Sequence, residues 1–297
     1  MRNRVRIVVI LTVLVGVLFP LWSQSADELT RVDDLIEAEQ PEEALAAAEA
    51  LLMGTSGADR AEVLWRLSSA TLMLGDQAKD NGAGDDELLA IYERGETYGE
   101  EAIQSDPANP LGYYWKSANI GRWGQTKGVL NSLFRAPDMR DLLTEAVTRD
   151  PNHAESYYVL GQLYAQVPGF SFGDVEYAVS LGRKSVDLME AELSSGEREE
   201  INEAFYVQLA SHLIDRGWNE RRRNRKVDEI QSRYREAQTP IERGFFYEGT
   251  ANVPSVEDDE EAAAILDATI GRLEAKPSLT PGERRQLNEA RELRGSM

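Results

Sequence analysis

The side chains that most often carry enzyme chemistry are scarce in this chain. Cysteine is absent, and the two histidines, His153 and His212, have neither a second histidine at metal-ligand spacing nor a serine and carboxylate arrangement nearby. The missing cysteine excludes disulfides, thiolate metal sites and a cysteine nucleophile. We therefore expect both histidines to make ordinary hydrogen bonds, and we predict no catalytic residues and no enzyme activity.

Two glycine-containing segments have part of the composition of a ligand-binding loop but lack its key residues. A calcium loop over DNGAGDD (residues 80–86) would need acids at Gln77 and Lys79 and a glutamate at Leu88. The segment GRWGQTKG (residues 121–128) lacks the Gly-Lys-Ser/Thr signature of a phosphate-binding loop. We accordingly predict no metal ion and no cofactor.

One pattern does suggest ligand binding: three aromatic residues are each followed, four positions later, by a polar residue. The pairs are Trp65 and Ser69, Trp115 and Asn119, and Tyr158 and Gln162. Residues four apart share a helix face, so each pair would present a large ring beside a hydrogen-bonding group. Such a stripe suits an extended peptide or a ligand with apolar bulk and polar edges. Arg122 completes the candidate binding site. The alternative is that the rings form core between helices.

The elements that would position this stripe are helices. Alanine, leucine, glutamate and arginine dominate the chain after residue 25, and no segment alternates apolar and polar residues long enough for a strand. Helix starts are marked at Pro41, which two glutamates follow, and at the capping box that runs from Thr280 to Glu283. We predict an all-α fold.

Repeated segments indicate how these helices are arranged. AIQSDP (residues 102–107) and AVTRDP (residues 146–151) place Asp-Pro at the same point, where proline ends one helix. The next helix carries Tyr157, Leu160, Gly161 and Tyr164, the large, large, small, large pattern of a tetratricopeptide first helix. Segments that begin at Leu64, Tyr114 and Tyr206 follow it too. These four units predict a tetratricopeptide-like superhelical solenoid of stacked antiparallel helix pairs.

The units are longer than the roughly 34 residues of a simple repeat, so we expect the excess in inserted loops or long helices. Candidate loops are residues 78–86, 124–138 and 167–174. A helix pair over 27–38 and 41–53 would cap the N-terminal end. The repeat domain is predicted over 26–240. Residues 241–297 would form a linker and C-terminal capping helices at about 256–276 and 281–294.

The N-terminus has the pattern of a secretory signal peptide over residues 1–25. Arg2, Arg4 and Arg6 precede an uncharged run from Ile7 to Trp22. That run is shorter than the roughly 20 residues a membrane-spanning helix needs, and Pro20 interrupts it. An uncleaved anchor is therefore the weaker alternative, and we expect an exported, periplasmic or otherwise extracytoplasmic protein.

The charge of the chain limits its partners. With 52 acidic and 32 basic residues the formal net charge is −20, which disfavours nucleic acid and anionic lipid surfaces. The one dense basic run, from Arg221 to Lys226, is interpreted as a solvated helix face.

Several of these segments, in this order, carry a resemblance over residues 62–187. WRLSS from Trp65, AIQSDP, YYWKSANIG from Tyr113, AVTRDP and YVLGQLYAQVPG from Tyr158 resemble tetratricopeptide proteins related to the regulators of microtubule dynamics. They also resemble the helical T component of TRAP-type tripartite transporters. Neither resemblance implies catalytic residues. Microtubule binding is not transferred to a chain with an export signal, and the missing cysteine departs from the lipid-anchored T components.

These observations predict an exported scaffold that binds a protein partner or peptide, such as a solute-binding or envelope protein, through an aromatic-lined concave groove. The alternative is a ligand-binding accessory subunit of a tripartite (TRAP-type) solute transporter, with a small apolar ligand in a closed cavity. A continuous apolar lining would favour the transporter subunit, and an open polar groove would favour the scaffold.

The signal-peptide interpretation makes a direct prediction. Because Ser23 and Ser25 offer small residues where a signal peptidase reads the chain, the mature protein should begin near Ala26 and be soluble. N-terminal sequencing of protein isolated from its native cell checks this. Recovery of an intact Met1 in the membrane fraction would contradict it.

Overall fold

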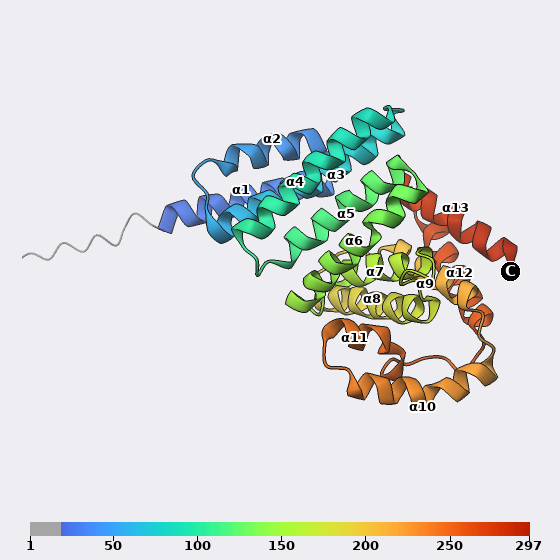
Figure 1. Cartoon of the computed structure of the whole chain (residues 1–297). Coiled ribbons are helices and arrows are strands. Elements are labelled where there is room, and N and C mark those ends of the chain that lie inside the picture. The colour runs from blue at the N-terminus through green and yellow to red at the C-terminus, as the bar shows by residue number, and fades with distance from the viewer. Residues whose placement is uncertain (1–18) are drawn as a thin grey trace, which may run out of the picture.

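The computed structural model describes residues 19–297, and every regular element in that range is helical (Figure 1). There are thirteen α-helices and one short 3-10 helix: α1 (Phe19–Glu37), α2 (Pro41–Leu52), α3 (Gly57–Asp80), α4 (Asp85–Ser105), α5 (Pro110–Lys127), α6 (Val129–Arg149), α7 (Ala154–Gln166), α8 (Val175–Ser195), α9 (Glu203–Arg216), α10 (Glu220–Glu236), α11 (Pro240–Phe245), η1 (Tyr247–Gly249), α12 (Asp258–Ala275) and α13 (Pro281–Ser296). The predicted all-α class is confirmed.

From α1 to α9, each helix packs against the next one along the chain, and Figure 1 shows them stacked in sequence order. Helix α3 also packs directly on α5. No single helix pair could bury its apolar face alone, so stacking generates a core that runs along the row. The expected helical-repeat solenoid is therefore present.

The Asp-Pro segments act as predicted. Helix α4 ends at Ser105 and α6 ends at Arg149, each just before Asp-Pro. The following helices are capped by side chains: Asn109 accepts a hydrogen bond from the Leu111 amide at 2.9 Å, and His153 accepts one from the Ser156 amide at 3.2 Å. His153 thus makes the ordinary hydrogen bond expected of it.

Two of the three predicted insertions are not loops. Only four residues, 81–84, separate α3 from α4, and Gly128 alone separates α5 from α6. Gly82 and Gly128 adopt φ angles of +84° and +99°, which glycine tolerates, so the chain reverses within a few residues. Residues 167–174 do form a loop between α7 and α8. Most of the extra length lies in long helices, such as the 24 residues of α3.

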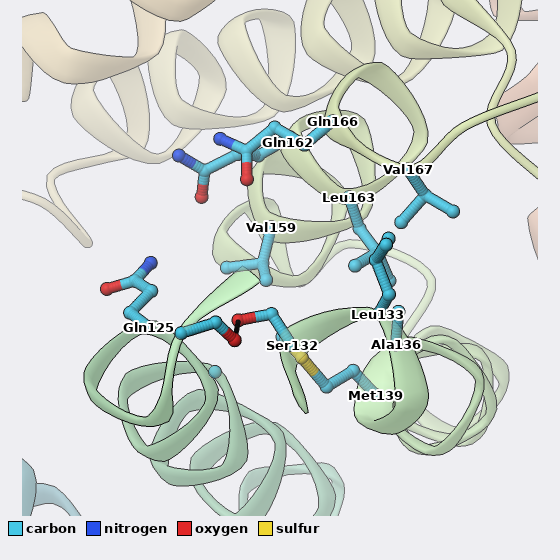
Figure 2. A pocket seen from close by; sticks show the side chains of 12 residues that line it. Gln125, Ser132, Leu133, Ala136, Met139, Val159, Gln162, Leu163, Gln166 and Val167 are labelled. Atoms are coloured by element: carbon cyan, nitrogen blue, oxygen red, sulfur yellow. Dashed lines mark hydrogen bonds between the residues drawn. The ribbon is translucent and has the colours of Figure 1, made fainter. Parts of the chain in front are cut away.

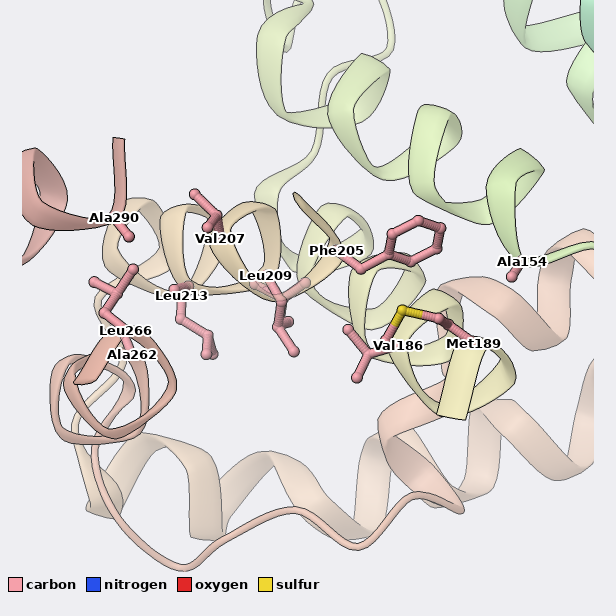
Figure 3. Packing of buried hydrophobic residues seen from close by; sticks show 12 residues of the cluster. Ala154, Val186, Met189, Phe205, Val207, Leu209, Leu213, Ala262, Leu266 and Ala290 are labelled. Atoms are coloured by element: carbon pink, nitrogen blue, oxygen red, sulfur yellow. The ribbon is translucent and has the colours of Figure 1, made fainter. Parts of the chain in front are cut away.

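The C-terminal part departs from a simple row. Helix α9 packs on α12 and α13, whereas α10 lies with α11 and η1 in a separate layer beside α8 (Figure 1). Ala154, Met189, Phe205, Leu213 and Leu266, which come from α7, α8, α9 and α12, share one buried cluster (Figure 3). The two predicted C-terminal helices are therefore part of the core that supports α7 and α9.

A buried network of charges joins this part of the molecule. It consists of three arginines and three acids: Arg183 on α8, Arg216 on α9, Arg223 on α10, Glu248 on η1, and Asp258 and Glu261 on α12. Their side chains are at most 7% exposed. The basic run from Arg221 to Lys226 was predicted to be a solvated face. That is wrong for Arg223, which points into the network, while Arg222 and Arg225 are exposed.

Asp258 is the most enclosed member of the network. It accepts hydrogen bonds from Arg216 at 2.8 and 2.9 Å, from Arg223 and from the Trp218 amide. Burial by itself raises the pKa of this carboxyl, but the hydrogen bonds and charge of Arg216, the Trp218 amide and the charge of Arg223 together lower the pKa overall. Asp258 therefore stays charged and holds two arginines in place.

Removing the charge of Asp258 should destabilise the fold. Asp258→Asn leaves Arg216 and Arg223 buried without their main partner, which should lower the free energy of unfolding by about 3–5 kcal/mol. The control is Glu274→Gln in the exposed Arg291–Glu274 pair, which should change it by less than about 1 kcal/mol. Urea unfolding measures both. Equal effects of the two substitutions would show that the network contributes little.

Gly161 offers a test of the helix packing. A Cβ atom there would lie 3.3 Å from the Ala178 carbonyl oxygen and 3.4 Å from the Gly182 amide nitrogen, so Gly161→Leu should destabilise the fold by roughly 1–3 kcal/mol or more. Gly271, within α12, has open space around the same position. Gly271→Ala should instead stabilise by roughly 0.5–1 kcal/mol. Thermal melts that move in the same direction would contradict this packing.

Candidate functional site

A cavity of about 400 Å³ lies between α5, α6 and α7 (Figure 2). Its apolar wall consists of Leu133, Ala136 and Met139 of α6, Val159 and Leu163 of α7, and Val167 just beyond α7. Gly121 lines it from α5, and a Cβ at that position would lie only 3.0 Å from the Met139 methyl group. The absence of a side chain at Gly121 therefore lets Met139 lie close to α5 beside this apolar cavity.

Carboxamide groups line the other side of the apolar cavity. Figure 2 shows Gln125, Gln162 and Gln166 opposite Leu133, Met139 and Val167. Gln162 and Gln166 are four residues apart on α7 and so share one face of the helix. A carboxamide offers both donors and an acceptor, so this edge can pair with another amide group.

A second, more polar cavity of about 200 Å³ lies between α7, α9 and α13. Gln162 and Gln166 line it as well, and Tyr158 lies one turn before them on α7. Helix α9 contributes Ala204, Val207, Gln208, Ser211, His212 and Asp215, and α13 contributes Glu289. Because the two cavities share one face of α7, we treat them together and call them the α7 groove.

His212 is buried at the base of the polar cavity. Its Nδ1 lies 3.1 Å from the Ala178 carbonyl oxygen, which can only accept, so Nδ1 carries the proton and Nε2 is an acceptor. Burial lowers the pKa of His212 to about 4, and the hydrogen bond to Ala178 opposes this only in part. The imidazole is therefore neutral at physiological pH.

Of the seven predicted site residues, Tyr158 and Gln162 line the α7 groove. The Tyr158 ring stacks on Phe205 of α9 with centroids 4.7 Å apart, and burial raises the pKa of its hydroxyl. Tyr158 therefore contributes to the core between helices and also to the wall of a cavity. The stacking on Phe205 agrees with the core alternative raised by the sequence, and the role of Tyr158 in binding stays a prediction.

Trp65 and Ser69 lie on α3, away from the α7 groove. Trp65 is partly buried: its indole donates a hydrogen bond to Glu62 at 3.0 Å, and the Arg66 guanidinium lies 4.1 Å from its ring centroid. Ser69 is only 2% exposed. Ser69 was predicted to be a binding group. That prediction is wrong, because Ser69 is buried in the packing between helices.

Asn119 needs the same correction. It is fully buried and donates hydrogen bonds to the Ser68 and Trp115 carbonyls at 3.1 and 2.9 Å. A Cβ at Gly95 would lie 2.1 Å from Asn119 Oδ1, so the amide fills the contact where α4 meets α5. Trp115 remains partly exposed on the same helix, edge-on to Tyr114.

Arg122 forms an ion pair with Asp76. The pair is bidentate, at 2.8 and 2.9 Å, and the Tyr92 hydroxyl also donates to Asp76. The predicted stripe is therefore not one continuous surface, and its α7 portion lies in the α7 groove. Gln166 follows Tyr158 and Gln162 at the same spacing of four residues, so the sequence contained a signal that Gln166 shares their helix face.

The sequence contained no signal for the groove residues of α6 and α9, because only the tertiary packing brings them beside α7.

Within residues 19–297 no helix is long and apolar enough to cross a membrane. The same range has no group of three or more acidic, histidine or cysteine side chains placed to hold a metal ion.

The fold is that of an all-helical repeat protein, with two neighbouring cavities along α7. The chain belongs to the regulator of microtubule dynamics protein 1-3 family, whose model matches residues 28–184, more than half of the sequence. The resemblance to this family is thereby confirmed. The match includes every residue of the apolar cavity and ends before α9 and α13, which complete the polar cavity. No curated protein matches the chain.

The buried His212 predicts a specific pH dependence of stability. Between pH 6.5 and about 4 the unfolded chain binds a proton at this position that the folded chain does not, so stability should fall as the pH decreases. The slope due to this one group should approach about 1.4 kcal/mol per pH unit. The His212→Gln variant should lack this contribution to the slope of stability against pH. Parallel stability curves for the two proteins between pH 7 and pH 4.5 would contradict the burial of a neutral imidazole.

Proposed function

We propose that this chain is a non-catalytic scaffold that binds an extended segment of a protein partner in the α7 groove. The observation that carries the proposal is that Gln162 and Gln166 line both the apolar cavity and the polar cavity. A segment lying along α7 would pass these carboxamides and place side chains on either side of them.

The dimensions and chemistry of the apolar cavity support a peptide ligand. Its volume of about 400 Å³ is in the range of ligand sites, and its wall of leucine, methionine and valine side chains suits a large apolar residue. The carboxamides at its edge can donate to a peptide carbonyl and accept from a peptide amide, which recognises a backbone without requiring one sequence.

The repeat architecture also supports a scaffold. We interpret the repeats as tetratricopeptide units, because Tyr157, Leu160 and Gly161 follow that pattern and Gly161 lies at a close helix contact. Solenoids of this kind use extended concave surfaces for binding. Membership in the regulator of microtubule dynamics protein 1-3 family is compatible with a protein that acts by binding other proteins.

A ligand-binding accessory subunit of a tripartite transporter is the second candidate. The apolar lining of the larger cavity favours it, because a small apolar ligand would fit there. The polar cavity beside it favours a longer ligand with polar parts, and for that reason we place the peptide first.

We further propose that the scaffold acts outside the cytoplasm, with a solute-binding or envelope protein as its partner. This rests on the leader, most of which lies outside the described residues. Residues 1–18 are not described, and α1 begins at Phe19, ahead of the proposed cleavage near Ala26.

A site-specific crosslinker tests the groove in the native cell. A photoreactive residue at Gln166, which is exposed and lines both cavities, should crosslink to a partner segment that mass spectrometry can identify. Gln104 on α4 is the control, because it is an exposed glutamine outside the groove. Equal crosslinking from both positions, or none from Gln166, would contradict the proposal.

A further inference from the structure

Gln208 has an unusual position in the polar cavity. It is only 8% exposed, and neither its Nε2 nor its Oε1 has a hydrogen-bond partner among the described residues. Burying an unpaired carboxamide opposes folding, so such groups are rare unless something else supplies the partner. The side chain lines the cavity, which is where that partner would lie.

The charges around Gln208 indicate what the partner is. Asp215 of α9 and Glu289 of α13 line the same cavity, and neither has an ion-pair partner among the described residues. No lysine or arginine lines the cavity. Arg122, whose charge acts on Tyr158, is already paired with Asp76.

The other groups of the cavity fit a cation rather than an anion. His212 is neutral, with Nε2 as an acceptor, so it does not repel a positive charge. A lysine ammonium or an arginine guanidinium is a pure donor, which matches carboxylates and the Gln208 Oε1. The Gln208 Nε2 is then free to donate to a backbone carbonyl of the same ligand.

We infer that the polar cavity binds a basic side chain, lysine or arginine, of the partner segment whose apolar residue occupies the neighbouring cavity. This inference rests on the proposed function and names the chemistry of its ligand. The two side chains must be near neighbours in the partner, because Gln162 and Gln166 separate the two cavities. The net charge of −20 would also attract a basic segment from a distance.

Selection of peptides tests the inference. A displayed library of random peptides is selected on the immobilised full chain and on two variants. Asp215→Asn with Glu289→Gln removes the charges of the polar cavity, and Val159→Glu places a charge in the apolar cavity. The unaltered protein should enrich peptides that pair a large apolar residue with a nearby lysine or arginine. The neutralised variant should keep the apolar preference and lose the basic one.

The strength of the interaction is then measured with one selected peptide by fluorescence anisotropy. Replacing its basic residue with norleucine should weaken binding to the unaltered protein by about tenfold or more, and should leave binding to the neutralised variant unchanged. Gln208→Met supplies a second signature. It removes an unpaired polar group, so the melting temperature should rise while peptide affinity falls. A purely structural Gln208 would give a lower melting temperature and unaltered affinity.

The possible failures are distinguishable. If selected peptides share an apolar residue but no basic one, or if the basic preference persists in the neutralised variant, the inference is overturned and the proposed function stands. If no peptide is selected, or if Val159→Glu has no effect on a correctly folded chain, the proposed function itself is overturned. The inference then falls with it.

Discussion

The balance of charge in the buried network is the constraint on which the C-terminal half of the molecule depends. Three arginines and three acids from α8, α9, α10, η1 and α12 lie together almost without solvent. Removing charges from water costs several kcal/mol for each ion, and this cost is offset only when every charge keeps its partners. Each of the five elements must therefore occupy one position. This places α9 beside α7 and thereby forms one wall of the polar cavity.

Elsewhere the stack depends on small residues that permit close approach. Gly95 receives the Asn119 side chain and Gly161 lies against the backbone of α8, so these helix pairs leave no room for a ligand. Gly121 permits a similarly close approach, because a Cβ there would lie 3.0 Å from the Met139 methyl group, yet a cavity remains between α5, α6 and α7. Small residues thus set how closely these helices approach without filling all the space between them.

Helix α7 lies between the core and the two cavities. One of its faces supports the core through Tyr157 and Leu160, and another presents Tyr158, Gln162 and Gln166 to the two cavities. The position of α7 is fixed, because α8 packs along it and His153 caps its N-terminus. A groove with a rigid wall loses little entropy when a ligand binds, which suits recognition of a flexible segment. The family match includes α7 and the apolar cavity but ends before α9 and α13, so only the α7 side of the polar cavity lies within the matched residues.

The sequence by itself determined the helical class, the Asp-Pro helix ends, the two C-terminal helices and the position of Gly161. These depend on local preference, on capping and on a periodicity that recurs along the chain. It also placed Tyr158 and Gln162 on one helix face, because residues four apart share a face in any helix. Only the tertiary structure decided that Ser69 and Asn119 are buried and that Arg223 leaves the solvated face for an ion network. Only the tertiary structure places Gln208 and Glu289 in the same cavity as residues of α7. Those outcomes depend on which distant helices meet, and the spacing of residues along one helix contains no information about its neighbours.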